Sequence, residues 1–195
     1  MLCSKVVNGS QVRVRTLGET ASANPQGSTH DQILSDRVIP TEGSLMIVGV
    51  ISDIHGVLGT EAYEALEGSD IIMCAGDTES EGILMELESI APTIAVTGNC
   101  DRSSLISDVP FFAMPRIGGV RFLMVHRPED IGTPDEDVKV VIHGHTHVPR
   151  NQLIDGVLYL NPGSASRPRG GSKKSIARLT IELGKVSSVE FIEFA

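Results

Sequence analysis

The stretch Ile47-Val48-Gly49-Val50-Ile51-Ser52-Asp53-Ile54-His55-Gly56 is the segment around which the rest of the chain is organised. Four of its first five residues are β-branched and none is charged, which is typical of a strand covered on both faces. Asp53 and His55 follow this strand two positions apart, so their side chains are expected on one side, where an oxygen and an imidazole can bind one ion. An ordinary turn after the strand is the alternative interpretation, because Asp-x-His is a short motif.

The same design, an apolar run followed by polar side chains, returns four times later in the chain. The runs end in Gly76-Asp77, in Gly98-Asn99-Cys100-Asp101, in His126 and in Gly144-His145-Thr146-His147. Ligands of parallel α/β sheets bind beyond the carboxyl ends of the strands, so these side chains are expected to gather in one pocket.

The length and composition predict one α/β domain. A chain of 195 residues can build one substantial core, and with 41% hydrophobic but only 4% aromatic residues that core must consist of aliphatic side chains. No apolar run approaches the roughly 18 residues of a transmembrane helix, and the N-terminus lacks the pattern of a signal peptide. These features predict a cytoplasmic protein without a membrane partner.

The charge and the cysteines restrict the function further. A net charge of −9 argues against a protein that holds nucleic acid through its phosphates, although bound cations would reverse the local field for a small phosphate ester. The three cysteines, Cys3, Cys74 and Cys100, match no zinc motif and cannot all pair; Cys74 lies in an apolar run and is interpreted as a core residue.

Residues 1–45 differ in composition from residues 46–195 and are predicted to be a disordered extension of the folded domain. Residues 11–15 alternate like a strand, but the sequence offers no evident partner for them. Organelle targeting is a weaker alternative because the acidic content is wrong for a transit peptide. We also hypothesise that Met46 is the natural start of the protein, since a strand begins there.

The order of elements predicts two sheets. Helices expected at residues 60–67, with Thr60 as the N-cap, and at 79–90 alternate with strands, which implies parallel strands with right-handed crossovers over 46–99. The second half contains three hairpin signals, at Gly118-Gly119, Asp155-Gly156 and Gly184-Lys185. We therefore predict a four-layer α-β-β-α sandwich of two packed mixed β-sheets flanked by helices.

The five motifs together resemble the signature of the calcineurin-like metallophosphoesterases. The branch that is most similar contains small bacterial and archaeal phosphodiesterases and a subunit of the retromer complex. The resemblance covers 46–195 and extends to Asn161-Pro162-Gly163-Ser164 and to Cys100, where many relatives carry histidine.

The resemblance implies a dinuclear metal site with a bridging hydroxide that attacks phosphorus in a phosphate ester. It assigns Asp53, His55, Asp77 and His147 to one ion and Asp77, Asn99, His126 and His145 to the other. Two cations that lie close together need a shared carboxylate, here Asp77, to offset their repulsion. The net charge of the cluster, with its carboxylates and the bridging hydroxide included, is then near +1, which suits a small organic phosphate ester. Manganese is the metal we expect, with nickel, iron and zinc as alternatives, because mixed oxygen and nitrogen ligands accommodate all four.

Several residues depart from the family pattern or have two interpretations. Arg127 stands where a glycine is usual, and prolines at 128 and 134 interrupt a segment that is helical in relatives. Both departures lie next to the second metal site. In the alternative interpretation, His126 is an ordinary histidine at a strand end and binds no metal. His143 is interpreted as structural. Asp101 either orients a ligand or caps a turn.

Cys100 bears on the mechanism that the resemblance implies. Where relatives carry histidine, that residue protonates the leaving oxygen, and a thiol with a pKa near 8.5 is a poorer acid. We hypothesise that aryl or activated diesters are better substrates than alkyl monoesters.

The only basic cluster consists of Arg167, Arg169, Lys173 and Lys174. A solvated loop is the preferred interpretation and a phosphate-positioning loop the alternative, because Gly170-Gly171 implies mobility.

The predicted function is that of a metal-dependent phosphoric diester hydrolase. The alternatives are an interaction scaffold with little or no catalysis and a phosphomonoesterase. The family also suggests a homodimer.

Overall fold

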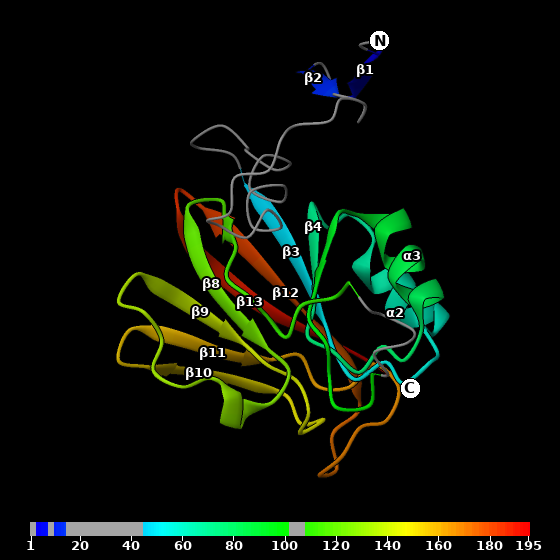
Figure 1. Ribbon diagram of the computed structural model, residues 1–195, viewed down its shortest axis with the longest axis vertical. Helices are drawn as coiled ribbons and strands as arrows, with labels where there is room; N and C mark the ends of the chain where they lie inside the picture. Colours follow the sequence, from blue (N-terminus) through cyan, green and yellow to red (C-terminus); the bar gives the residue numbers. More distant parts are fainter. Residues whose placement is uncertain (1–2, 8–9, 15–44, 102–107) are drawn as a thin grey trace.

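The structure, a computed structural model, describes residues 3–7, 10–14, 45–101 and 108–195. Two β-sheets form the body of the molecule (Figure 1). In the five-stranded sheet the order is β13-β12-β3-β4-β5. The strands span Met46–Ile51 (β3), Ile71–Cys74 (β4), Thr93–Ala95 (β5), Lys174–Glu182 (β12) and Lys185–Phe194 (β13). The first three are parallel, and β12 runs antiparallel to both of its neighbours.

The six-stranded sheet has the order β10-β11-β9-β8-β6, and β7 also pairs with β8. Its strands span Phe112–Ala113 (β6), Arg116–Ile117 (β7), Val120–Val125 (β8), Val138–Ile142 (β9), Arg150–Ile154 (β10) and Val157–Asn161 (β11). Strands β8, β9 and β11 are parallel, whereas the other pairings are antiparallel. All three predicted hairpins are confirmed, and both sheets are mixed.

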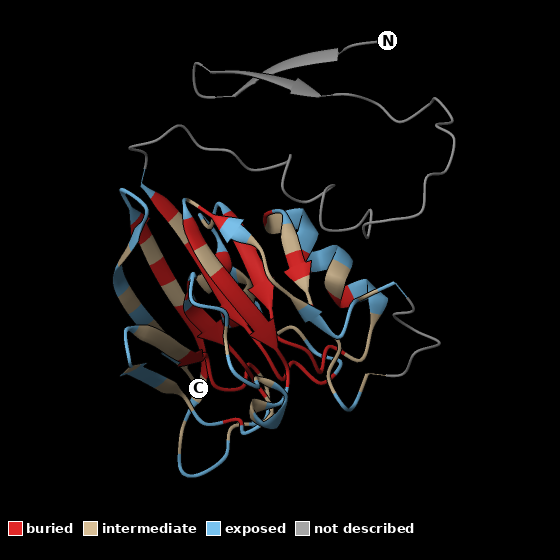
Figure 2. Ribbon diagram, turned by 60° about the vertical axis from the view of Figure 1, so that its left-hand side comes forward, coloured by how far each residue is buried: buried red, intermediate tan, exposed pale blue. Residues whose placement is uncertain are grey.

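The main core lies between the two sheets, where buried strands appear red in Figure 2. Val48 and Val50 of β3 pack there against Phe122 and Met124 of β8. Alternate residues of β3 face the other way, so Ile51 belongs to a second cluster together with the helices. A strand buried on both faces needs apolar residues at every position, which explains the uninterrupted run in the sequence.

Two α-helices in the described part of the chain cover the outer face of the five-stranded sheet (Figure 1). Helix α2 spans Thr60–Leu66 and α3 spans Glu81–Ile90. The N-cap of α2 is Gly59, and the prediction that Thr60 is the N-cap is wrong. Thr60 is already the first residue of the helix. Against the outer face of the six-stranded sheet, the described residues contribute only the 3-10 helix η1, Pro128–Asp130, in the segment where prolines interrupt the expected helix.

The N-terminal segment contains two strands, β1 (Cys3–Val7) and β2 (Ser10–Val14), which pair antiparallel as a separate sheet. Strand β1 is the partner of residues 11–14 of the alternating segment, for which the sequence shows no evident partner, whereas residue 15 lies outside the described residues. Residues 15–44, most of the predicted extension, lie outside the described residues, so its disorder and the start at Met46 stay predictions. Within the described part, none of the helices has the length and hydropathy needed to cross a membrane.

Candidate metal centre

All seven predicted ligands follow the carboxyl ends of parallel strands. Asp53 and His55 come after β3, Asp77 after β4, Asn99 after β5, His126 after β8, and His145 and His147 after β9. The donors thus come from both sheets and meet at one edge of the sandwich. This is the location that the βαβ topology predicts for a ligand site.

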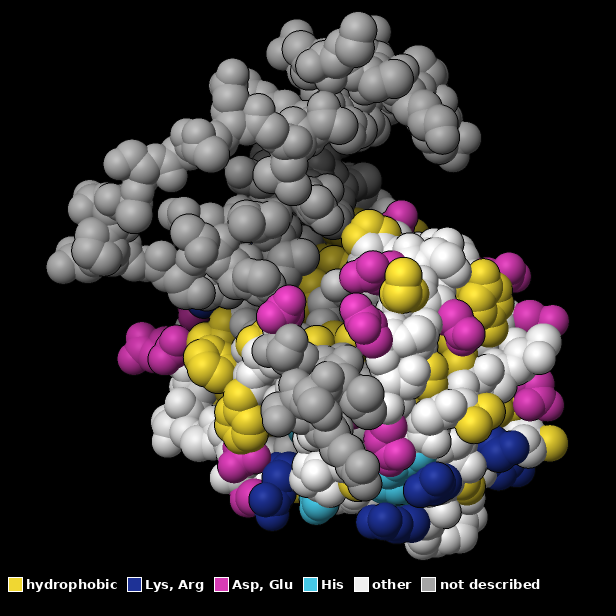
Figure 3. All heavy atoms as spheres, turned by 45° about the vertical axis from the view of Figure 1, so that its right-hand side comes forward, with side chains coloured by type: hydrophobic (Ala, Val, Ile, Leu, Met, Phe, Trp, Pro, Cys, Tyr) yellow, Lys and Arg dark blue, Asp and Glu magenta, His cyan; other side chains and the backbone are white. Residues whose placement is uncertain are grey.

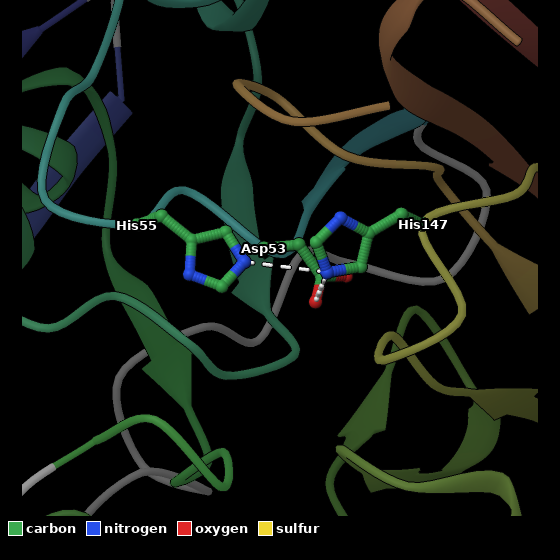
Figure 4. A group of neighbouring side chains, drawn as sticks. All are labelled: Asp53, His55 and His147. Carbon is green, nitrogen blue, oxygen red and sulfur yellow. Dashed lines mark hydrogen bonds and ion pairs between the residues drawn. The ribbon is translucent and has the colours of Figure 1, made fainter. Parts of the chain in front are cut away.

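The first group of donors, the Asp53 group, consists of Asp53, His55 and His147 (Figure 4). The Nε2 atom of His147 lies 3.1 Å from Asp53 Oδ1 and 3.3 Å from His55 Nε2. All three side chains are buried. One carboxylate oxygen and two imidazole nitrogens therefore point at one position.

The second group, the Asn99 group, consists of Asn99, His126 and His145. The Oδ1 atom of Asn99 lies 3.1 Å from His126 Nε2 and 2.7 Å from His145 Nδ1. Asp77 lies between the groups, with Oδ2 3.4 Å from His126 Nε2 and 3.9 Å from His55 Nε2. The carboxylate predicted to bridge two ions thus faces one histidine from each group.

The far nitrogens of three of these histidines are hydrogen-bonded to acceptors. The Nδ1 atom of His55 lies 2.7 Å from Glu79 Oε1, that of His126 lies 2.7 Å from the Ala75 carbonyl oxygen, and that of His147 contacts the Arg167 carbonyl oxygen. Because these acceptors need a proton from Nδ1, each neutral ring presents a lone pair at Nε2 toward the site. Two such lone pairs 3.3 Å apart beside a carboxylate suit a divalent cation, so the residues fit the metal that the family resemblance implies.

The backbone at the site is held in an uncommon conformation. Eight described residues other than glycine have positive φ values between 48° and 68°. Six of them belong to the site, namely Asp53, His55, Asp77, Glu79, His145 and His147. Left-handed conformations are rare outside glycine and concentrate at functional sites, where the surrounding structure maintains them. The strand ends therefore turn sharply to direct these side chains to one point.

Asp101 organises the turn that carries Asp77. Its carboxylate accepts hydrogen bonds from the backbone N–H groups of Asp77 (2.9 Å), Gly98 (2.7 Å) and Glu79 (2.6 Å), and from the Thr78 hydroxyl (3.2 Å). Asp101 therefore caps a turn and fixes the backbone of Asp77, while its role in orienting a ligand stays a prediction.

Two glycines allow the strand ends to approach the carboxylates closely. A Cβ atom on Gly98 would lie 2.1 Å from Asp77 Oδ1, and one on Gly144 would lie 1.9 Å from Ser52 Oγ and 2.9 Å from Asp53 Oδ2. Larger residues at these positions would displace the Asp side chains. The glycines of the Gly-Asn and Gly-His motifs thus have a steric role.

Cys100 contacts both parts of the centre. Its backbone N–H donates to Asp77 Oδ1 at 2.8 Å, and its Sγ atom accepts from Asn99 Nδ2 at 3.3 Å. Its sulfur forms a group with donor atoms of His55 and Asp77 that lie within 4.8 Å of one another. Desolvation, followed by the interaction with Asp77, raises the pKa of the thiol to about 11.

The surroundings of three candidate donors shift their pKa values. Burial opposes ionisation of Asp77, but hydrogen bonds from His126 and Cys100 outweigh it and hold the pKa of Asp77 far below its usual range. Burial also favours the neutral form of His126, yet its contacts with Asp77 and Ala75 leave its pKa raised. The pKa of His147 is raised chiefly by its hydrogen bond with Asp53.

The remaining predicted residues surround the centre. His143 is buried and bonds to the carbonyl oxygen of Gly144 at 3.1 Å, and its Nε2 atom lies 3.4 Å from Arg150 Nη1. Burial lowers the pKa of His143. The contacts agree with the structural role predicted for this histidine.

The basic cluster divides into two parts. Lys173 pairs with Glu193 at 3.2 Å, and Lys174 Nζ donates to the carbonyl oxygen of Ala195 at 2.8 Å. Arg167 and Arg169 are exposed and their backbones bond to His147. In Figure 3, exposed histidine surface lies beside Lys and Arg side chains at the lower edge of the molecule. The loop thus packs against the centre instead of being solvated along its whole length.

Sequence reasoning missed three residues that support the donors. The hydroxyl of Ser164 donates to the Asp53 carbonyl oxygen at 2.8 Å, and Asn161 Nδ2 donates to the Gly144 carbonyl oxygen at 2.9 Å. Both belong to the Asn-Pro-Gly-Ser motif, which the sequence alone marks only through the family resemblance. Glu79, the third, gave no sequence signal beyond its position two residues after Asp77.

Comparisons with known proteins find similar sequences that are named as phosphoesterases. A probable metallophosphoesterase of Methanothermobacter thermautotrophicus is 32% identical over 138 residues, which cover 64% of this chain and 80% of that protein. Phosphodiesterase YfcE of Escherichia coli strain K12 is 30% identical over 155 residues, covering 66% of this chain and 84% of that protein.

Solved structures show the same fold. A novel archaeal phosphodiesterase superposes with a TM-score of 0.63 at 25% identity, over 76% of this chain and all of that chain. A single mutant of Vps29 from Entamoeba histolytica superposes with a TM-score of 0.62 at 22% identity, over 77% and 100% of the two chains. The family model of the calcineurin-like phosphoesterase superfamily domain matches residues 46–184. The chain therefore belongs to the calcineurin-like phosphoesterase superfamily.

Proposed function

We propose that the chain is a metal-dependent phosphodiesterase that acts on small organic phosphate esters. The observation that supports this most directly is the convergence of the Asp53 group, the Asn99 group and Asp77 at one edge of the sandwich. The relatives named as phosphoesterases support the same reaction class.

Two divalent ions, with manganese as first choice, would polarise the phosphoryl oxygens and supply activated water for attack on phosphorus. The Asp53 group would hold one ion and the Asn99 group the other, with Asp77 shared. The residues around them fix the donors in advance, so little reorganisation is needed when substrate binds. The exposed Asn99 and Cys100 leave the second group open to an incoming ester.

Hydrolysis of bis-(p-nitrophenyl) phosphate tests the proposal. The protein is treated with a chelator, each metal is added back separately, and release of p-nitrophenol is compared with that from the monoester. We expect activity to return with divalent metal and to be absent from the Asp77→Asn variant. Full activity in Asp77→Asn would reject a mechanism in which this carboxylate joins two ions.

The preference for diesters with good leaving groups is supported by Cys100. A thiol is a poor proton donor to a leaving oxygen, and an aryl oxide needs less protonation than an alkoxide. Faster turnover of alkyl monoesters than of aryl diesters, under saturating metal, would reject this preference.

A binding scaffold is the second candidate function, and one surface feature favours it. A hollow of about 210 Å³ lies over the outer face of the six-stranded sheet and is lined by Phe111, Phe112 and Ile131 among other residues. The two phenylalanines are 56% and 54% exposed, and exposed aromatic side chains are common at protein interfaces. A correctly folded protein that takes up no metal at micromolar supply would favour the scaffold over the enzyme.

A further inference from the structure

We infer that Glu79 is a positioning residue of the metal centre, whose carboxylate holds His55 in the tautomer and orientation needed to bind an ion. The inference rests on the proposed metal centre and adds a residue that the ligand set does not contain. Glu79 Oε1 lies 2.7 Å from His55 Nδ1, on the side of the ring away from Asp53 and His147.

The contact determines which nitrogen of His55 carries the proton. A carboxylate at Nδ1 accepts the ring proton there, and Nε2 is left with a lone pair that faces His147 Nε2 at 3.3 Å and Asp77 Oδ2 at 3.9 Å. A free imidazole would instead favour the proton on Nε2. Carboxylate–histidine–metal arrangements of this kind fix the tautomer and the orientation of the ring.

The backbone of Glu79 is fixed for this contact. Its φ value is +62°, in the left-handed region that favours glycine, so a long side chain here is conformationally unfavourable. The N–H of Glu79 donates to Asp101 Oδ1 at 2.6 Å, and Asp101 also accepts the N–H of Asp77. One carboxylate thus sets the positions of both the bridging ligand and the residue that orients His55.

Glu79 is placed to orient a ligand and not to act as one. Its carboxylate contacts Nδ1 of His55, whereas the donor atoms of the centre lie on the Nε2 side. Among the described residues, clusters of His, Cys, Asp or Glu donor atoms that could hold an ion are Asp53/His55/His147, His55/Asp77/Cys100 and Asp53/Asp77/His126. None of the three includes Glu79.

Two variants test the inference. Glu79→Gly removes the carboxylate and keeps the backbone, because glycine adopts φ +62° without strain. Glu79→Gln keeps an oxygen acceptor but removes the charge. Glu81→Gln is the matched control, since Glu81 is exposed in the first turn of α3, two residues away. Thermal unfolding establishes that each protein is folded.

Metal affinity is measured for Mn²⁺ and Zn²⁺ by calorimetry and by competition with a chelating dye. We expect the affinity for one of the two ions to fall about 10-fold to 100-fold in Glu79→Gly, by a smaller factor in Glu79→Gln, and not to change in Glu81→Gln. In metal-free protein, long-range ¹⁵N NMR spectra should show His55 protonated on Nδ1, and Glu79→Gly should populate the Nε2–H tautomer.

The outcomes separate this inference from the proposed function. If the wild-type protein binds metal and both Glu79 variants bind it with equal affinity and an unchanged His55 tautomer, the inference is wrong and the proposed function stands. If the folded wild-type protein binds no metal, the proposed function fails. Should Glu79→Gly not fold, the comparison of Glu79→Gln with Glu81→Gln decides.

Discussion

The Asp53 group and the Asn99 group use similar donors but differ in how firmly those donors are held. Asp53, His55 and His147 are all buried, and the far nitrogens of both histidines have acceptors. In the Asn99 group only His126 is buried and anchored in this way, through the Ala75 carbonyl oxygen. Asn99 is exposed, His145 is partly exposed, and they bond to each other.

This difference assigns separate tasks to the two halves. Buried donors with fixed orientation lose little conformational entropy on binding an ion, so the Asp53 group is expected to bind more tightly. If the Asn99 group holds an ion as proposed, we expect that ion to exchange more readily and the substrate to enter on this side, because two of the donors reach solvent. Asp77, which faces His55 and His126, couples the halves.

Asp77→Asn should have the largest effect, because it weakens both halves together. We expect phosphodiesterase activity to fall by about 10³-fold or more, the order of effect seen when a central electrostatic group is lost, and both ions to be lost on dialysis. Metal content by mass spectrometry and initial rates measure this. Asp135→Asn, at an exposed position, is the control and should retain both.

His147→Ala and His145→Ala form a matched pair that tests the difference directly. The two residues are separated by one position, and both have left-handed backbones. His147→Ala should abolish binding of the tighter ion, whereas His145→Ala should leave that ion bound and weaken the second about 10-fold to 100-fold. Calorimetric titration resolves the two events. Equal losses from both variants would show that the halves are not distinct.

Gly98→Ala tests whether close packing, apart from ligand chemistry, holds Asp77 in place. The added methyl group would meet Asp77 Oδ1 at 2.1 Å, so we expect a loss of about 1–3 kcal/mol in the free energy of unfolding and weaker binding of both ions. Gly59→Ala is the control, since a Cβ atom there meets nothing within 4 Å. Urea unfolding with and without metal separates the two effects.

The metal affinities of the Asp53 group and the Asn99 group should depend on pH in the same way. The pKa values of His147 and His126, one in each group, are raised, so protons compete with both ions as the pH falls. Each affinity should drop about 10-fold per pH unit below these pKa values, while their ratio stays constant. A ratio that changes between pH 8 and pH 6 would contradict this.

The free energy of unfolding of the chelated protein should increase as the pH falls, whereas the metal affinity should decrease. Because the folded pKa values of His126 and His147 exceed their unfolded values, their protonated forms stabilise the fold below the unfolded pKa. That contribution is lost as the pH rises through the folded values. Chemical denaturation of chelated protein at pH 6 and pH 8 measures it.

The position of the candidate donors at the strand ends could be predicted because each strand end carries a short, ordered motif. Uncharged runs such as 47–51 require burial on both faces, and parallel topology then brings their carboxyl ends to one edge. Glu79 could not be predicted, since its role depends on a left-handed backbone set by Asp101, twenty-two residues later. On the second sheet the described residues contribute only η1, in the segment where the sequence analysis noted the interrupting prolines. The cap of α2 was also misplaced by one residue.

Arg169→Ala should produce the smallest effect and tests the loop beside the Asp53 group. Arg169 is exposed, its backbone bonds to His147, and its charge acts to lower the pKa of that histidine, so it lies near the centre without belonging to it. An exposed cation that meets a phosphate contributes about 0.2–1 kcal/mol, so KM should rise by about 1.5-fold to 5-fold with kcat and metal content unchanged. Lys174→Ala is the control, because its ammonium group is engaged with Ala195. If KM keeps its full dependence on salt in Arg169→Ala and in Arg167→Ala, the loop does not position phosphate, and the difference between the halves resides in the ligands alone.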